Sequence, residues 1–196
     1  MYELSEVVLE QAALGDMDAF EQMMRHYEKL IYSITTRMFP NKEDAEDMLQ
    51  EVFMKAYKNI GSCKSLKHYK TWLCTIATNT CIDELRRRKN KDAKSLDEDA
   101  AAGGQAELYV VSSQPTPEDA AIGSETWREL QRAMDKLSEN EKILIVLRDI
   151  EGFSYQETAE ITGLNLGTLK SRLSRARLKL RKLFLLEQNR NKHVIS

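Results

Sequence analysis

The sequence contains few helix-breaking residues, with only 8 glycines and 3 prolines among 196 residues. This scarcity excludes collagen-like and low-complexity chains, and 31% charged beside 42% hydrophobic residues is typical of a helix-rich globular protein. No run approaches the roughly 18 apolar residues that a membrane span requires. The N-terminal residues Met1–Glu6 contain no basic segment followed by an apolar one, so no secretory signal and a cytoplasmic location are predicted.

Cysteine and histidine are also scarce, with 3 of each. Cys63, Cys74 and Cys81 lack CxxC spacing, which argues against a zinc site and a disulfide framework, and we interpret them as small buried side chains. The histidines lie far apart in the sequence, so we expect no metal or other cofactor. No nucleophile motif, paired carboxylates or phosphate-binding glycine loop is present, and we therefore predict that the protein is not an enzyme.

The formal net charge of −2 conceals a very uneven distribution of charge. Residues 61–94 carry 9 basic and 3 acidic side chains, and residues 167–196 carry 9 and 1, whereas residues 95–125 carry 7 acidic and no basic ones. A single basic block is most simply a solvated helix face. Two blocks, each at the end of an amphipathic helical region, favour a polyanion that is contacted at two places.

Apolar residues recur at helical spacing along most of the chain, which predicts an all-α fold of two small helical domains joined by a flexible linker. The first domain is predicted at residues 1–92, with Asp16 as an N-cap, a helix at 43–59 and a long helix from Leu66 to about Asn90. The acidic, small and unpatterned residues 93–115 are the predicted linker. The second domain is predicted at residues 116–196 and begins with Thr116 as an N-cap before Pro117.

The second domain carries the signals of a helix-turn-helix. Capping boxes at 138–141 and 154–157 each open a helix, and Gly163 supplies a turn before Asn165 caps a longer basic helix. On that helix Leu169, Leu173 and Ala176 form a packing stripe, whereas basic and hydroxyl side chains lie on the other side. These features favour a helix that enters the major groove of DNA over the alternative, a solvated basic face on an αα-hairpin.

The long helix of the first domain has a polar face with an aromatic residue. Trp72, Thr75, Asn79, Asp83 and Arg86 recur at spacings of three and four, and the helix ends in a basic run. Such a face suits a nucleic acid with unpaired bases, because aromatics stack on bases, asparagine reads base edges and arginine holds phosphates. On these residues alone, however, a core tryptophan with a basic helix end that compensates the helix dipole is the favoured explanation.

Four motifs in order resemble the extracytoplasmic-function (ECF) group of RNA polymerase sigma factors. Residues 44–57, together with 71–79 and 82–87, resemble sigma region 2, and residues 152–159 and 167–177 resemble region 4. The resemblance covers most of the chain outside the predicted linker. It implies a region 2 helical bundle in the first domain and a region 4 helix-turn-helix in the second.

The resemblance also implies a mechanism in which core RNA polymerase and promoter DNA are the partners. Region 2 would bind the clamp helices of the largest polymerase subunit and read and melt the −10 element, and region 4 would bind the flap of the second-largest subunit and read the −35 element. By motif position, the residues implied to contact polymerase are Asp44, Asp47, Gln50 and Glu51. Those implied to contact the −10 element are Trp72, Thr75, Asn79, Asp83, Arg86, Arg87 and Lys64. Those implied to contact the −35 element are Thr168, Lys170, Ser171, Arg172, Ser174, Arg175 and Arg177.

An anti-sigma factor that clamps between the two domains is a further implied partner, and we expect a monomer without stable membrane insertion when partners are absent. The alternative is a stand-alone helix-turn-helix transcription regulator whose first domain senses a signal or dimerises. The two interpretations differ in whether promoter-specific activity requires core polymerase. The sequence does not give the promoter sequence, the inducing signal or a role for Leu166 and Leu178.

Overall fold

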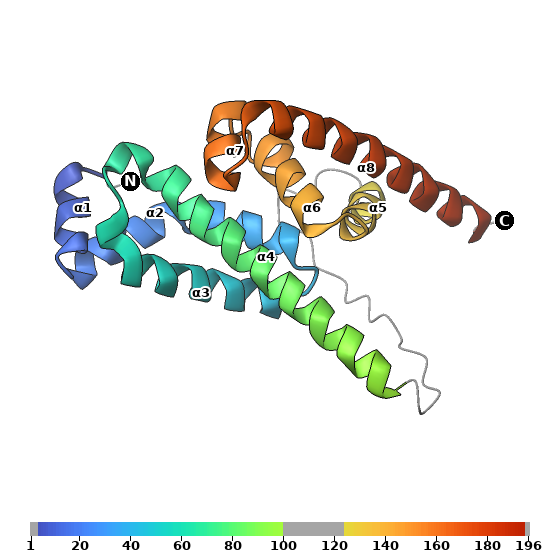
Figure 1. The fold of residues 1–196 in the computed structure, drawn as a ribbon, viewed down its shortest axis with the longest axis horizontal. Helices are drawn as coiled ribbons and strands as arrows, with labels where there is room; N and C mark the ends of the chain where they lie inside the picture. Colours follow the sequence, from blue (N-terminus) through green and yellow to red (C-terminus); the bar gives the residue numbers. More distant parts are fainter. Residues whose placement is uncertain (1–3, 100–123, 195–196) are drawn as a thin grey trace.

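The computed structural model describes residues 4–99 and 124–194, and the side chains of residues 4–91 and 126–190. Within these residues every regular element is helical (Figure 1), which confirms the predicted all-α class. We refer to residues 4–99 as the N-terminal module and to residues 124–194 as the C-terminal module. None of the described helices is both long and apolar enough to cross a membrane. The described side chains also include no cluster of histidine, cysteine and acidic residues that fits a metal ion.

The N-terminal module consists of α1 (Glu6–Ala13), α2 (Met17–Met38), α3 (Lys42–Asn59), a 3-10 turn (η1, Ile60–Ser62) and α4 (Leu66–Asp99). Asp16 caps α2 as predicted, because its carboxylate accepts hydrogen bonds from the backbone N–H groups of Asp18 and Ala19 at 3.0 Å. The apolar stripe of α3 is buried as well, and it consists of Ala45, Met48, Val52, Phe53 and Ala56.

Helix α4 continues beyond the predicted end near Asn90 and reaches Asp99. The reason is local, since residues 91–99 contain no glycine or proline and include alanine, leucine, glutamate and lysine, which favour helices. The first part of the predicted linker is therefore helical. The rest of it, and the predicted N-cap at Thr116, lie outside the described residues.

The C-terminal module consists of α5 (Ser124–Asp135), α6 (Glu139–Ile145), a π-helical turn (η3, Val146–Ile150), α7 (Tyr155–Thr162) and α8 (Leu166–Val194). Both predicted capping boxes are present, at Ser138 and Ser154. Gly163 has a φ of +66°, and the Asn165 side chain accepts a hydrogen bond from the Thr168 N–H at 2.8 Å. The predicted turn between α7 and α8 is thus confirmed.

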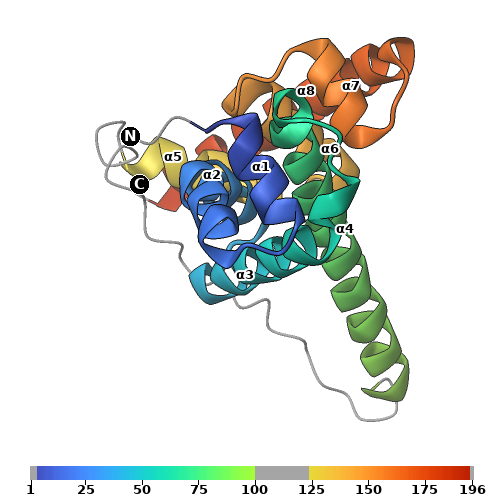
Figure 2. The same ribbon diagram turned by 90° about the vertical axis from the view of Figure 1, so that its left-hand side faces the viewer.

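The two modules pack directly against each other. Helix α4 contacts α2 and α3 on one side and α6 and α7 on the other, while its C-terminal end projects from the body (Figures 1 and 2). One continuous cluster of buried apolar side chains includes Met38 and Phe39 of the N-terminal module and Ile143, Leu144 and Phe153 of the C-terminal module. In the described part of the chain the modules therefore share a core, which the sequence did not indicate.

Candidate nucleic-acid and polymerase interfaces

Helix α8 presents a basic face to solvent because its apolar stripe faces inward. Leu169, Leu173 and Ala176 are at most 1% exposed and fix the rotation of the helix about its axis. The opposite side near its N-terminus is exposed and carries Lys170, Ser171, Ser174 and Arg175. These four predicted −35 residues thus lie together on one accessible surface, which has the length and charge to enter a major groove.

The first turns of α8 hold this surface in a defined geometry. Ser171 Oγ donates to the Thr168 carbonyl oxygen at 2.9 Å, and Arg175 Nε donates to the Ser171 carbonyl oxygen at 3.4 Å. Thr168 itself is only partly exposed, and its N–H is already bonded to Asn165. The Thr168 backbone therefore helps to close the first turn of α8, and Arg175 is exposed further along the helix.

Arg172 and Arg177 are also exposed, but each lies against another part of the chain. Arg177 pairs with Asp149 through two contacts, at 2.9 and 2.5 Å, and this pairing raises the pKa of Arg177. Arg172 lines a cavity that faces α4 of the other module. Leu178 is 58% exposed beyond these residues, and nothing in the structure explains its position.

The polar face of α4 divides into two parts. At its N-terminal end Trp72 is half-buried, packs against the Tyr69 ring at 5.3 Å and donates from Nε1 to Ser62 Oγ at 3.1 Å. Thr75 donates to the Thr71 carbonyl oxygen at 2.8 Å. Lys64, in the segment between η1 and α4, is exposed. The half-buried Trp72 ring therefore lies beside the short polar segment that contains Ser62 and Lys64, and it is the kind of aromatic side chain on which an unpaired base stacks.

The second part of the α4 face lies opposite the C-terminal module. Asn79, Asp83 and Arg86 are exposed, and they line a cavity of about 280 Å³ whose other wall includes Asn140, Leu144, Thr162, Leu164 and Arg172. The cavity therefore lies between predicted −10 residues and the C-terminal module. No local pattern in the sequence indicates this juxtaposition.

The basic run at the end of this face is tied to carboxylates. Arg87 and Arg88 both pair with Glu84 at 2.7 Å, and Arg88 also binds Asp44 at 2.6 and 2.8 Å. The pKa of Glu84 falls to about 2, because the hydrogen bonds from Arg87 and Arg88 outweigh the opposing effect of burial. Asp44, a predicted polymerase contact, thus has a partner within the chain.

The other predicted polymerase contacts lie on the outer side of α3. Asp47 and Gln50 are exposed, and Glu51 is half-buried and pairs with Lys55 at 2.7 Å. Gln50 lies at the edge of a groove of about 1080 Å³ between α2 and α3. The groove has apolar walls and charged rims, and its lining includes Phe20, Met24, Leu49, Phe53 and Met54. Sequence reasoning missed this groove, although the exposed Met54 beside the apolar stripe of α3 was a possible signal.

Comparisons with known proteins match both modules. The family model described as Sigma-70 region 2 matches residues 23–91, and the one described as Sigma-70, region 4 matches residues 127–180. The ECF RNA polymerase sigma factor SigW of Bacillus subtilis (strain 168) is 37% identical over 176 residues, which are 89% of this chain and 93% of SigW. The ECF RNA polymerase sigma-E factor of Escherichia coli (strain K12) is 32% identical over 176 residues, which are 88% and 90% of the two chains.

Solved structures show the same fold. The sigma factor RpoE in complex with the anti-sigma factor NepR from Bartonella quintana aligns with a TM-score of 0.64 at 27% identity, over 84% of this chain and 95% of RpoE. CnrH in complex with the cytosolic domain of CnrY aligns with a TM-score of 0.61 over 91% and 95%, and at 23% identity this likeness concerns the fold alone. With both regions matched in order and full-length relatives above 30% identity, the chain belongs to the ECF group of RNA polymerase sigma factors.

Proposed function

We propose that this sigma factor binds core RNA polymerase and directs transcription from promoters whose −10 and −35 elements it reads. The observation that carries the proposal is the exposed basic surface of Lys170, Ser171, Ser174 and Arg175 on a helix-turn-helix of the C-terminal module. It is joined in one chain to a helix with base-reading residue types in the N-terminal module. We propose no catalytic role and a cytoplasmic site of action, where polymerase and promoters are found.

For the −35 element, we propose that the N-terminal half of α8 enters the major groove. Arg175 suits a guanine edge, Ser171 and Ser174 suit several bases, and Lys170 suits a phosphate. Arg177 is held by Asp149, so its proposed role is to contact a phosphate while bracing α8. Arg172 lines the cavity beside α4, so its proposed contact with DNA would be made from that side of α8.

For the −10 element, we propose that single-stranded bases lie along α4. Trp72 would stack on a base next to the segment that contains Lys64, and Asn79 would read the edge of a flipped base. Thr75, Asp83 and Arg86 continue the same face, and Arg87 would contribute charge for phosphates. Flipping needs both a pocket and an edge reader, and the η1 segment beside Trp72 supplies polar groups for such a pocket.

For polymerase, we propose that Asp47 and Gln50 meet the clamp helices while the groove between α2 and α3 accepts apolar side chains. Glu51 and Asp44 would support this surface through Lys55 and Arg88. We also propose an anti-sigma factor as a regulatory partner, as in the RpoE structure with NepR. The position of that inhibitor between the two modules stays a prediction, and in the present arrangement it would have to separate them.

A run-off transcription assay tests the proposal. Genomic promoter fragments are transcribed with the chain plus core polymerase, with core alone and with the chain alone. We expect discrete transcripts only when both proteins are present, and weak DNA binding by the chain alone. Tight operator binding without core, together with no core-dependent transcript, would instead support a stand-alone regulator.

A further inference from the structure

The cavity of about 280 Å³ beside α4 has walls from both modules. Its polar lining includes, from α4, Thr78, Asn79, Asp83 and Arg86 and, from the C-terminal module, Asn140 and Arg172. Arg86 donates across it to Asn140 Oδ1 at 3.5 Å, so a molecule held between the two walls can touch both. Most of these polar side chains are exposed, and the cavity is therefore open to small molecules from solvent.

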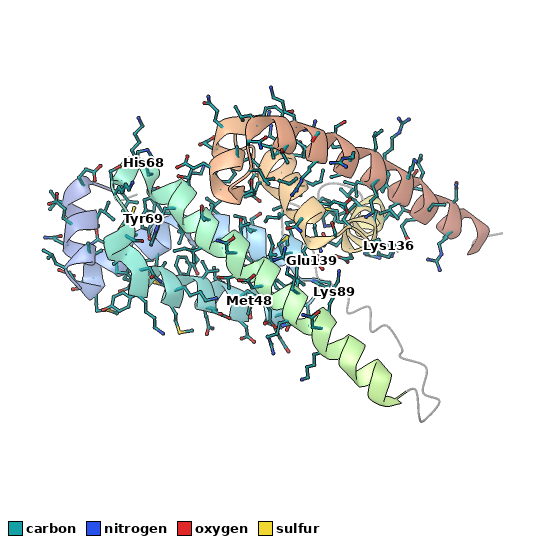
Figure 3. All side chains as sticks on the ribbon, viewed as in Figure 1. Met48, His68, Tyr69, Lys89, Lys136 and Glu139 are labelled. Carbon is teal, nitrogen blue, oxygen red and sulfur yellow. The ribbon has the colours of Figure 1, made fainter. Side chains whose placement is uncertain are left out.

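The charged groups inside this cavity lack partners, whereas those next to it are paired. Outside the lining, Lys89 of α4 forms an ion pair with Glu139 of α6 (Figure 3). Within the lining, the side chains of Asn79, Asp83 and Arg172 have no hydrogen bond or ion pair with any residue whose side chain the structure describes. One amide, one carboxylate and one guanidinium are thus available to a ligand.

Thr78 provides an independent indication of a bound molecule. Its side chain is 1% exposed, and its hydroxyl oxygen has no hydrogen-bond partner among the described residues. Buried hydroxyl groups nearly always have a partner, and one turn earlier Thr75 donates to the Thr71 carbonyl oxygen at 2.8 Å. A polar atom of a ligand in the cavity would supply the partner that Thr78 lacks.

The apolar part of the lining favours a flat ring. Ile82, Ile143, Leu144 and Leu164 lie among the polar groups of the cavity. Sites for small molecules combine such apolar walls with a few polar groups, and their volumes are about 300–1,000 Å³. A cavity of about 280 Å³ lies at the lower end of this range, so it suits a molecule of the size of one nucleotide and not an extended strand.

The polar groups match a phosphate and a guanine ring. Arginine binds phosphate through paired N–H donors, and Arg86 and Arg172 both line the cavity. An ionised carboxylate such as Asp83 only accepts hydrogen bonds, so it suits a ring edge that donates. Guanine carries N–H donors at N1 and N2 side by side, whereas adenine has an acceptor at N1. Asn79, Asp83 and Arg86 span about 10 Å along one face of α4, which is close to the length of a mononucleotide.

We propose that this cavity binds a guanine mononucleotide. Arg86 and Arg172 hold the phosphate, Asp83 and Asn79 bind the edge of the ring, and Thr78 forms a hydrogen bond with the ligand. The site is distinct from the face of α4 alone, because half of its lining belongs to the C-terminal module. It concerns the free chain, so the inference does not depend on the proposed promoter function.

Isothermal titration calorimetry of the free full-length chain tests the site, with guanosine monophosphate (GMP), adenosine monophosphate (AMP) and inorganic phosphate as the probes. We expect GMP to bind at least about tenfold more tightly than AMP, because adenine leaves the Asp83 carboxylate without donors. Inorganic phosphate should bind more weakly than GMP. If GMP does not bind at millimolar concentration, or if GMP and AMP bind equally, the proposal is overturned.

Variants on the two walls test the assignment of each group. Arg172→Ala should weaken the binding of both nucleotides about tenfold, and Asp83→Asn should weaken that of GMP about tenfold without changing that of AMP. Arg181→Ala removes an exposed arginine of α8 that does not line the cavity, and it should bind GMP within about twofold of the wild type. Equal affinities for Arg172→Ala and Arg181→Ala would mean that α8 only attracts anions in general, and this result contradicts the site.

Thr78→Val tests the buried hydroxyl with little change of shape. Since this hydroxyl has no partner in the free chain, its removal should not lower the free energy of unfolding, whereas GMP should bind about threefold more weakly. Urea unfolding and calorimetry measure the two quantities on the same variant. An unchanged affinity for GMP would contradict the contact with Thr78.

Discussion

At the scale of single residues, Arg175 is the side chain of α8 best placed to distinguish one base pair from another. It is exposed on the outward face and is not engaged in a described ion pair. Arg175→Ala should weaken binding of the holoenzyme to its promoter by about 1–3 kcal/mol and relax the base preference at one −35 position. Binding is measured on a set of promoters with each −35 base changed in turn. Arg181→Ala, further along α8, is the control, and an equal loss on every sequence would mean that Arg175 contacts only phosphate.

Asn79 lines the cavity beside α6 and does not belong to the apolar core, so we expect its replacement to affect DNA reading and not folding. Asn79→Ala should reduce open-complex formation at the promoter by about 10-fold or more, since the loss of a bidentate base contact is worth about 1–3 kcal/mol. The affinity for core polymerase should not change. Permanganate footprinting of the melted strand and a core-binding titration check the two statements. A parallel loss of core affinity would identify Asn79 as a structural residue.

The lowered pKa of Glu84 predicts that the free energy of unfolding depends on pH in the acidic range. Its pKa is about 2 in the folded chain, below its ordinary value of 4.5, because Arg87 and Arg88 donate hydrogen bonds to it. The stabilisation from a depressed pKa is fully present above 4.5, and it is lost as the pH falls from about 4.5 towards about 2. Urea unfolding across this range should show the loss in the wild type and a smaller loss in Glu84→Gln. Glu160→Gln should retain the wild-type dependence, and an identical slope in Glu84→Gln would refute the assignment.

At the scale of elements, the turn between α7 and α8 depends on one backbone conformation. Gly163 has a φ of +66°, and a Cβ at this position would meet no heavy atom within 4 Å. The penalty of Gly163→Ala is therefore conformational and not steric, and we expect a loss of about 1 kcal/mol in the free energy of unfolding. Gly61→Ala has similar open space without a positive φ, so it should change stability little. Chemical denaturation compares the two, and equal losses would exclude this explanation.

Local signals explain which elements the sequence could predict. Asp16, Ser138 and Ser154 cap helices through bonds to residues two or three positions away, so the information lies within a short segment. The predicted end of α4 near Asn90 is too early, because the acidic composition that follows does not by itself end a helix. The residues from Asn90 to Asp99 include no proline or glycine that would end a helix.

At the scale of the whole molecule, the boundary between the modules could not be predicted from the sequence. The exposed surface of α8 followed from helical periodicity, and its residues lie together as expected. In contrast, the cavity that brings Arg172 opposite Asn79 depends on how two separate helical groups pack. Lys142 stands beside the apolar residues 143–147, and no local pattern indicates that its ammonium binds a carbonyl group about a hundred residues away.

Lys142 therefore provides the prediction that tests the packing of the whole chain. Its side chain is 6% exposed and binds both the Met38 carbonyl oxygen and Asp135, the latter at 2.6 Å. In Lys142→Met the buried carbonyl group loses its donor and Asp135 loses its counter-charge, so we expect about 1–3 kcal/mol of destabilisation by urea unfolding. Lys179→Met is the matched control, because the Lys179–Glu141 pair is exposed and should contribute at most about 1 kcal/mol. If the two variants were equally stable, Lys142 would not join the modules in solution. A larger loss for Lys142→Met, with an unchanged dependence on urea concentration, would mean that the modules unfold as one unit.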